Sequence, residues 1–220
     1  MLGEHEATVS RHLSRTRRDL REAAEAHLRA ADPVLARIID VVGPAPLRVN
    51  RTPAFAALLE SIVYQQITGK AAASIHRKLC AALGRRIPRP QDITAASEAT
   101  LRGAGLSGVK VSYMRDLAVR AVSGLPLRSL SRLEDEQVVE ALVEVKGIGR
   151  WTAEMFLMFR LLRPDVLPVG DYGIRKAMQR AYRLRKLPNP ERMEKIAAPW
   201  RPYRSVACWY LWRSLDSPAG

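Results

Sequence analysis

The sequence has little cysteine and histidine, and it has no long apolar segment. Its two cysteines, Cys80 and Cys208, lie far apart in apolar surroundings, which predicts buried free thiols in a reducing cytoplasm. An iron–sulfur cluster, which needs about four thiolates, is excluded. The four histidines show no metal-ligand spacing, so we expect no metal site. No apolar run is long enough to cross a bilayer and no secretory signal opens the chain, so we expect a cytoplasmic protein without a membrane partner.

Strand patterns are also scarce. Residues 47–49 alternate too briefly to count as a strand. Apolar positions recur at helical spacing instead, which predicts an all-α fold of two helical lobes with a cleft between them. We expect the helices of residues 1–49 to pack on a core formed by residues 50–215. The predicted helices are 4–31 (one or two helices), 33–42, 53–66, 71–83, 92–96, 97–104, 108–122, 134–143, 150–162, 171–183, 190–198 and 203–215.

Acidic charge is in short supply relative to basic charge. Lysine and arginine total 36 against 22 aspartates and glutamates, which gives a formal net charge of +14 and a pI of about 10.5. Such a surface favours a polyanionic partner. Nucleic acid is the favoured partner, and an anionic membrane is the alternative on charge alone.

Residues 138–160 predict a helix, a tight turn with two glycines, and a second helix. Gly147 and Gly149 permit positive φ and leave backbone amides uncovered. Amides at the N-terminus of the second helix suit a phosphate, and Lys146 and Arg150 flank them with full charges. A Gly-x-Gly turn alone is often just a connection, but in a strongly basic chain it favours phosphate binding without sequence specificity.

Four motifs resemble one family. Residues 146–153 read Lys-Gly-Ile-Gly-Arg-Trp-Thr-Ala and residues 167–174 read Leu-Pro-Val-Gly-Asp-Tyr-Gly-Ile. Residues 64–70 read Tyr-Gln-Gln-Ile-Thr-Gly-Lys and residues 200–205 read Trp-Arg-Pro-Tyr-Arg-Ser. Together they resemble the helix-hairpin-helix DNA glycosylases, in the branch called 3-methyladenine DNA glycosylase II. The match covers roughly residues 50–215, in a compact form without the additional N-terminal α/β domain of some relatives.

The resemblance implies base excision repair by a monomeric enzyme of bacterial type, associated with the nucleoid through DNA binding. Its substrate would be double-stranded DNA containing alkylated bases of the 3-methyladenine and 7-methylguanine class. The enzyme would flip the base out of the duplex, hydrolyse the glycosidic bond and leave an abasic site. It would need no cofactor, although a structural monovalent cation bound by hairpin carbonyls near Val143–Val145 is known in such hairpins.

Asp171 is the predicted catalytic residue, and we expect it to open onto the cleft. Alkylation puts positive charge on the base, which then leaves easily, and a carboxylate stabilises the oxocarbenium sugar that remains. The same carboxylate can orient or deprotonate the attacking water. The alternative is an ordinary helix N-cap, and one aspartate can serve both roles.

The resemblance also places Trp151 where strand-cutting relatives carry the lysine that forms a Schiff base. Neither Lys70 nor Lys146 lies at that position, so we expect a monofunctional enzyme with water as the nucleophile.

The remaining site residues are carried over from the family's motifs. Gln66 falls on the position of the wedge that fills the gap in the base stack, although a polar helix cap is the alternative. Aromatic faces stack on a cationic base, and core packing is the alternative for each of them. The predicted base pocket consists of Trp151, Tyr172, Trp212, Tyr64 and Met155, which replaces an aromatic residue of relatives. The predicted DNA contacts are Gln66, Thr68, Lys146, Gly147, Ile148, Gly149, Arg150 and Thr152. Trp200 and Trp209 are expected in the core.

Three other functions compete with this interpretation. The chain could be a non-catalytic DNA-binding module, but simple phosphate binding does not require Asp171 or the aromatic positions. It could be a glycosylase for mismatched or oxidised bases, but the lysine and cluster cysteines of those enzymes are missing. It could be a basic amphipathic protein on membranes, which helix 4–31 allows and the motifs do not favour.

Overall fold

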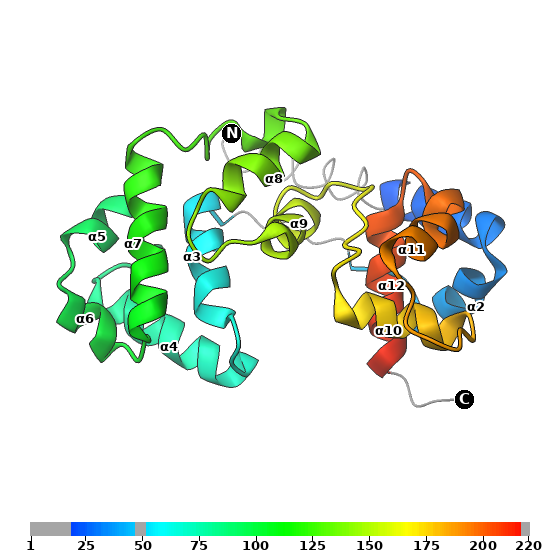
Figure 1. The fold of residues 1–220 in the computed structure, drawn as a ribbon, viewed down its shortest axis with the longest axis horizontal. Helices are drawn as coiled ribbons and strands as arrows, with labels where there is room; N and C mark the ends of the chain where they lie inside the picture. Colours follow the sequence, from blue (N-terminus) through cyan, green and yellow to red (C-terminus); the bar gives the residue numbers. More distant parts are fainter. Residues whose placement is uncertain (1–18, 47–51, 217–220) are drawn as a thin grey trace, which may run out of the picture. The chain divides into compact units, whose positions relative to one another are not determined.

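The computed structural model describes residues 19–46 and 52–216, and within them it is helical with no strand. The all-α prediction is therefore confirmed. The chain folds into two compact units, each seen in Figure 1. The first is formed by Met1–Arg48 together with Arg163–Gly220, and the second by Val49–Leu162. The first unit thus combines the two ends of the chain, and the second is one continuous stretch.

The second unit is organised around α7 (Gly108–Val122), which packs against α3 and α5. Ser107 begins α7 by accepting a hydrogen bond from the Lys110 amide at 3.3 Å, and Met114 and Leu117 are buried in the core. Helices α8 and α9 pack against each other as a helical hairpin. The other elements are α3 (Ala54–Tyr64), α4 (Gly69–Ala82), α5 (Pro90–Ala95), α6 (Glu98–Gly103), the short 3₁₀ helix η1 (Leu130–Arg132), α8 (Asp135–Val143) and α9 (Arg150–Phe159).

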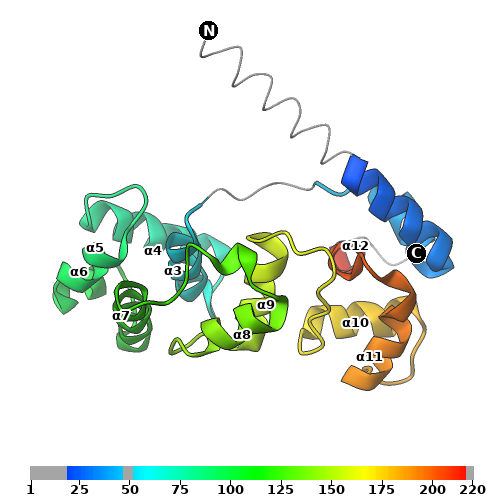
Figure 2. The same cartoon turned by 90° about the horizontal axis from the view of Figure 1, so that it is seen from above.

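The first unit is built around α12 (Arg204–Asp216), which packs against both α2 (Figure 1) and α10 (Figure 2). Much of α12 is buried, including Cys208, Tyr210 and Leu211, because helices cover it on more than one side. The other elements are a helical segment over residues 19–31, α2 (Pro33–Val42), α10 (Tyr172–Ala181), α11 (Pro190–Ala197) and the 3₁₀ helix η2 (Ala198–Trp200).

Asp32 joins the N-terminal and C-terminal parts of this unit. One carboxylate oxygen caps α2 by accepting from the Val34 amide at 2.8 Å. The other accepts from the Tyr182 hydroxyl at 2.6 Å and from the Trp200 indole at 2.8 Å. Burial, followed by the bond to Asp32, raises the pKa of Tyr182 far above its ordinary value. The predicted helix start at residues 32 and 33 is thus also a buried polar junction.

Most helix bounds match the sequence prediction closely, and α9 is an informative exception. The prediction extended it to residue 162, but it ends at Phe159. Leu162 has a φ of 56°, and the Leu161 amide donates to the Phe156 carbonyl at 3.0 Å, which closes the helix. Part of the predicted helix 4–31 and the residues 47–49 lie outside the described residues.

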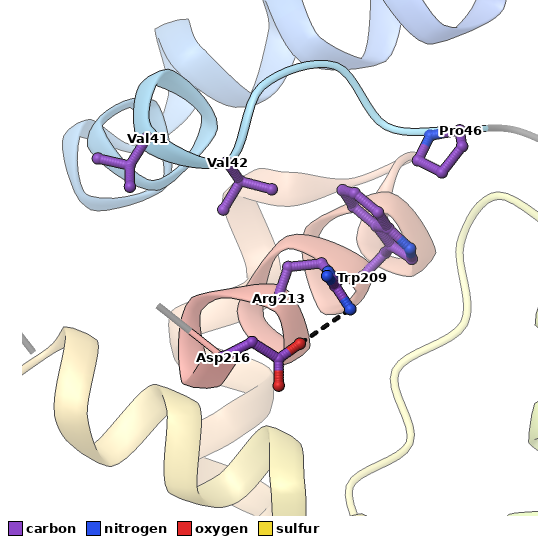
Figure 3. A pocket seen from close by; sticks show the side chains of 6 residues that line it. All are labelled: Val41, Val42, Pro46, Trp209, Arg213 and Asp216. Carbon is purple, nitrogen blue, oxygen red and sulfur yellow. Dashed lines mark ion pairs between the residues drawn. The ribbon is translucent and has the colours of Figure 1, made fainter. Parts of the chain in front are cut away.

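Two expectations of burial are wrong. Trp200 is fully buried as predicted, but Trp209 is only partly buried because it faces a cavity of about 540 Å³ beside the end of α2 (Figure 3). Arg213 and Asp216, an ion pair at 2.8 Å, line the same cavity. Cys208 is a buried free thiol, whereas Cys80 is half-buried near the exposed end of α4.

Candidate active site

Asp171 is the N-cap of α10 and is largely buried, with 7% of its surface exposed. Its Oδ1 accepts from the Ile174 amide at 2.7 Å and from the Trp212 indole Nε1 at 2.9 Å. The Asp171 amide donates to the Pro168 carbonyl at 2.9 Å, which fixes the backbone before the helix. A carboxylate held by two donors and by its own backbone has one orientation, which is what a preorganised electrostatic group requires.

Trp212 and Gly173 complete this arrangement. Trp212 is half-buried on α12, and its ring nitrogen reaches Asp171 across the contact between α12 and α10. Gly173 leaves the space for this approach. A Cβ built there would lie 3.1 Å from Asp171 Oδ1 and 3.1 Å from Trp212 Nε1, which is tighter than ordinary van der Waals contact. Trp212 therefore orients the carboxylate, a contact that the sequence did not predict.

The motif at residues 200–205 holds the segment that leads to Asp171. The Arg204 guanidinium binds the Asp165 carboxylate with Nε at 2.7 Å from Oδ1, and it also donates to the Asp165 carbonyl at 2.8 Å. The Ser205 hydroxyl accepts from the Val166 amide at 2.9 Å, and the Ser205 amide donates to the Pro164 carbonyl at 2.9 Å. These residues thereby fix residues 164–166, five to seven positions before the predicted catalytic group.

In the second unit, the turn between α8 and α9 depends on Gly147. Its φ is +80°, a conformation that glycine adopts without strain, and a Cβ there would lie 2.1 Å from the Tyr113 ring. Gly149 differs, because its φ is −90° and a Cβ built on it would meet no atom within 4 Å. It is the N-cap of α9, where no side chain of the described residues caps the helix. The first amides of this helix, which have no helical partners, suit an anion.

Two side chains from other segments hold this turn. The Asp116 carboxylate on α7 accepts from the Lys146 amide at 2.9 Å and from the Arg120 Nε at 3.0 Å. Gln65, which follows α3, donates through Nε2 to the Gly147 carbonyl at 2.8 Å. The predicted phosphate-binding turn is therefore fixed from α7 and from the α3–α4 turn at once.

The α3–α4 turn is itself fixed. The Lys110 ammonium donates to the Val63 carbonyl at 2.6 Å and to the Gln65 carbonyl at 2.8 Å, and burial lowers the pKa of Lys110. Gln66 is exposed with a φ of 57°, uncommon for a residue other than glycine. Thr68 caps α4 by accepting from the Ala71 amide at 3.4 Å. Gln66 thus projects from a constrained turn, as a wedge would have to.

The other predicted site residues differ in exposure. Trp151 is 49% exposed, Tyr172 66% and Tyr64 39%, large fractions for aromatic side chains, and Met155 is half-buried. Lys146 is exposed. Arg150 is also exposed, but it pairs with Glu136 and lies 3.8 Å from Glu154. The side chains of Ile148 and Thr152 are buried, so these two residues would contact DNA through their backbone.

The predicted site residues fall into two groups. Asp171, Tyr172 and Trp212 belong to the first unit, and all the others belong to the second. Across the described residues, no three or more His, Cys, Asp or Glu side chains gather in a way that could hold a metal ion. The helices described here include none with both the length and the apolarity to cross a membrane.

Several supporting residues were missed by the sequence analysis. Gln65, Lys110, Asp116 and Tyr113 act on the turns through contacts between distant parts of the chain, and no local pattern signals them. Gly173 lies inside a quoted motif, where a glycine near the start of a helix could have indicated a close approach.

Comparisons with known proteins agree on one family. The family model described as HhH-GPD superfamily base excision DNA repair protein matches residues 59–202 of the sequence. DNA-3-methyladenine glycosylase 1 of Schizosaccharomyces pombe is 33% identical over 198 residues, which cover 87% of this chain and 86% of that protein.

Solved structures lead to the same group. The structure of the S. pombe 3-methyladenine DNA glycosylase Mag1 in complex with abasic DNA is similar with a TM-score of 0.78 and 32% identity, over 89% of this chain and 97% of that one. A DNA-3-methyladenine glycosidase from Bacillus halodurans is similar with a TM-score of 0.77 and 35% identity, over 86% and 87% of the two chains.

Proposed function

Because the chain belongs to the HhH-GPD superfamily of base excision DNA repair proteins, we propose that it is a monofunctional glycosylase that removes alkylated bases from double-stranded DNA. The observation that carries the proposal is the Asp171 carboxylate, buried and held by the Ile174 amide and the Trp212 indole. Relatives named as 3-methyladenine glycosylases support the substrate class. We also propose that the protein is a monomer and that it associates with the nucleoid by binding DNA.

The chemistry follows from the charge of the substrate. A purine alkylated at N3 or N7 carries positive charge and leaves as a neutral base, so no acid is needed to protonate it. The sugar left behind develops positive charge, which the negative charge of Asp171 stabilises. Water then attacks the sugar carbon, and Asp171 orients it and accepts its proton. Because two donors fix the carboxylate before reaction, little reorganisation is required during the step.

DNA binding and base selection use the other predicted residues. The turn at Lys146–Gly149 and the first amides of α9 bind the backbone near the lesion, and Gln66 fills the gap left in the stack. The exposed ring of Trp151 stacks on the base. In the first unit Tyr172 and Trp212 contact the base, and in the second unit Tyr64 and Met155 do so. Thr68, Arg150 and Thr152 contribute to the DNA contact. The monovalent cation expected near Val143–Val145 would need main-chain oxygens, of which the Val145 carbonyl already accepts from the Ile148 amide at 3.0 Å.

Water is the nucleophile in this proposal because the position of the lysine in strand-cutting enzymes is occupied by Trp151. The structure shows a further lysine at the α3–α4 turn, Lys110, whose ammonium is engaged by the Val63 and Gln65 carbonyls. The reaction then ends at the abasic site.

Replacing Asp171 with asparagine tests the proposal. Asparagine caps helices as well as aspartate does, so α10 and duplex affinity should be preserved while the negative charge is lost. Release of free base from methylated duplex DNA should fall by about 10² to 10³. Excision that stays near the wild-type rate would refute the role of Asp171.

Asp32 offers a matched control. It too is a buried aspartate that caps a helix and accepts from a tryptophan indole. Asp32→Asn should lower thermal stability and leave base release unchanged at temperatures where the variant is folded. If both variants lost excision equally, Asp171 would act only as a structural cap, and the role of its carboxylate in catalysis would be refuted.

A further inference from the structure

Helix α10 and the turn after it carry a row of cations on their exposed side. Beyond the exposed Tyr172, two exposed cations follow at spacings of four residues, which places them along one side of the helix. Three more exposed cations lie in the turn that follows. The set, which we call the α10 basic surface, consists of Lys176, Arg180, Arg183, Arg185 and Lys186.

The charge of this surface is not balanced. Residues 172–190 contain no acidic side chain. In the parts of the chain that the structure describes, none of the five cations forms an ion pair, whereas Arg201 and Arg204 of the same unit both pair with Asp165. Like charges at helical spacing, such as Lys176 and Arg180, repel each other. Because residues 172–190 supply no carboxylate to balance these charges, an external anion is their natural partner.

Arg183 adds an independent observation. It has a φ of 51° at the position after the C-cap of α10, and the Leu184 amide next to it donates to the Gln179 carbonyl at 2.9 Å. Helices commonly place glycine here, because glycine adopts left-handed backbone without strain. The exposed arginine side chain does not fill the core. The Arg183 side chain therefore adds an exposed charge at a position where packing does not require it.

We propose that the α10 basic surface binds phosphates of duplex DNA beside the nucleotide that Asp171 receives. This rests on the proposed function for the place of the reacting nucleotide. At about 1.5 Å per residue, Arg180, the last of these cations within α10, lies roughly 13.5 Å along the helix from Asp171. A strand rises about 3.4 Å per nucleotide, so this part of the row matches the length of about four nucleotides. The surface would anchor DNA by charge alone, without reading its sequence.

Arg183→Gly separates this role from a structural one. Glycine removes the backbone strain, so the melting temperature should be equal to or higher than that of the wild type. Affinity for an undamaged duplex of about 20 base pairs, two helical turns, should nevertheless fall. The slope of log Kd against log salt should decrease by about 0.9, so a fourfold rise in salt would weaken binding about 3.5-fold less than in the wild type. In Arg180→Gln/Arg183→Gly the slope should decrease by about 1.8.

The control removes the same charge elsewhere in the unit. Arg29 and Arg37 are exposed on the segment 19–31 and on α2, which packs on α12 as α10 does. Arg29→Gln/Arg37→Gln should leave the slope at its wild-type value. An unchanged slope in Arg180→Gln/Arg183→Gly would overturn the inference. An equal decrease in the control would also overturn it, because net charge would then explain the effect. The inference would also be overturned if the α10 variant lost binding to vesicles containing phosphatidylserine but kept its binding to the duplex.

A second assay distinguishes the proposed glycosylase function from the proposed phosphate surface. It measures base release from methylated duplex under single-turnover conditions at saturating enzyme. The α10 variants should release base at the wild-type rate there. If the wild type released no base but the slopes changed as expected, only the proposed function would fail. If release were intact and the slopes did not change, only the phosphate surface would fail.

Discussion

The two glycines of the α8–α9 turn should respond to alanine in opposite ways. At Gly147, left-handed backbone costs a residue with a Cβ about 1–2 kcal/mol. The methyl group would also lie 2.1 Å from the Tyr113 ring, and overpacking of this kind costs about 1–3 kcal/mol. Gly147→Ala should therefore lower the free energy of unfolding by about 2–5 kcal/mol, measured by urea denaturation.

Gly149→Ala should leave stability within about 0.5 kcal/mol of the wild type. Its backbone is not left-handed and no atom lies near the new methyl group. Alanine is a poorer N-cap than glycine, but the loss of freedom in the unfolded chain offsets this. The methyl would stand where a phosphate approaches the N-terminus of α9. Duplex affinity should fall about tenfold, as for the loss of one hydrogen bond to a charged group.

A double-mutant cycle between Gly147 and Tyr113 checks the origin of the first effect. Tyr113→Ala removes the ring, so Gly147→Ala should cost at least about 1 kcal/mol less in that background, leaving the backbone strain. Additive effects of the two substitutions would refute the clash. A Gly147→Ala variant as stable as the wild type, or a Gly149→Ala variant with unchanged duplex affinity, would refute the assignment of the two glycines.

Gly173→Ala should slow base release about tenfold with little change in duplex affinity. The new Cβ would lie 3.1 Å from both Asp171 Oδ1 and Trp212 Nε1, and it would displace the carboxylate by a fraction of an ångström. A comparison of single-turnover rate with duplex Kd measures this, and a variant with the wild-type rate would contradict it. Borohydride added during excision should trap no protein–DNA adduct, and strands should break only after alkali, because Trp151 replaces the Schiff-base lysine. A trapped adduct would direct attention to Lys110, as well as to Lys70 and Lys146.

The local features of the fold could be predicted well from the sequence. Helix α7 occupies the predicted residues 108–122, and Asp171 caps α10 as its position before an apolar helical pattern indicated. These features depend on side chains within a few residues of each other, such as Ser107 and the Lys110 amide. The hairpin was predicted for the same reason, because its glycines and its two amphipathic helices are adjacent in the chain.

The supports of the site could not be predicted, because they join residues far apart in sequence. Asp116 reaches the Lys146 amide across 30 positions, and Gln65 reaches Gly147 across 82. Trp212 lies 41 positions after Asp171, and its motif suggested a pocket residue rather than a donor to the carboxylate. The end of α9 was also missed, because Leu162 has the left-handed backbone that usually signals glycine at a helix end.

The division of the first unit between the two ends of the chain has a consequence for its synthesis. A ribosome releases the N-terminal residue first, so Val49–Leu162, a continuous stretch, can fold while translation continues. The segment 19–46 has to wait for its partners, because Asp32 needs Tyr182 and Trp200 to satisfy its buried carboxylate. The nascent chain therefore forms the glycine turn between α8 and α9 early. Asp171 gains its contact with Trp212 last. An interrupted translation product would hold the phosphate-binding turn without the group proposed to cut the glycosidic bond.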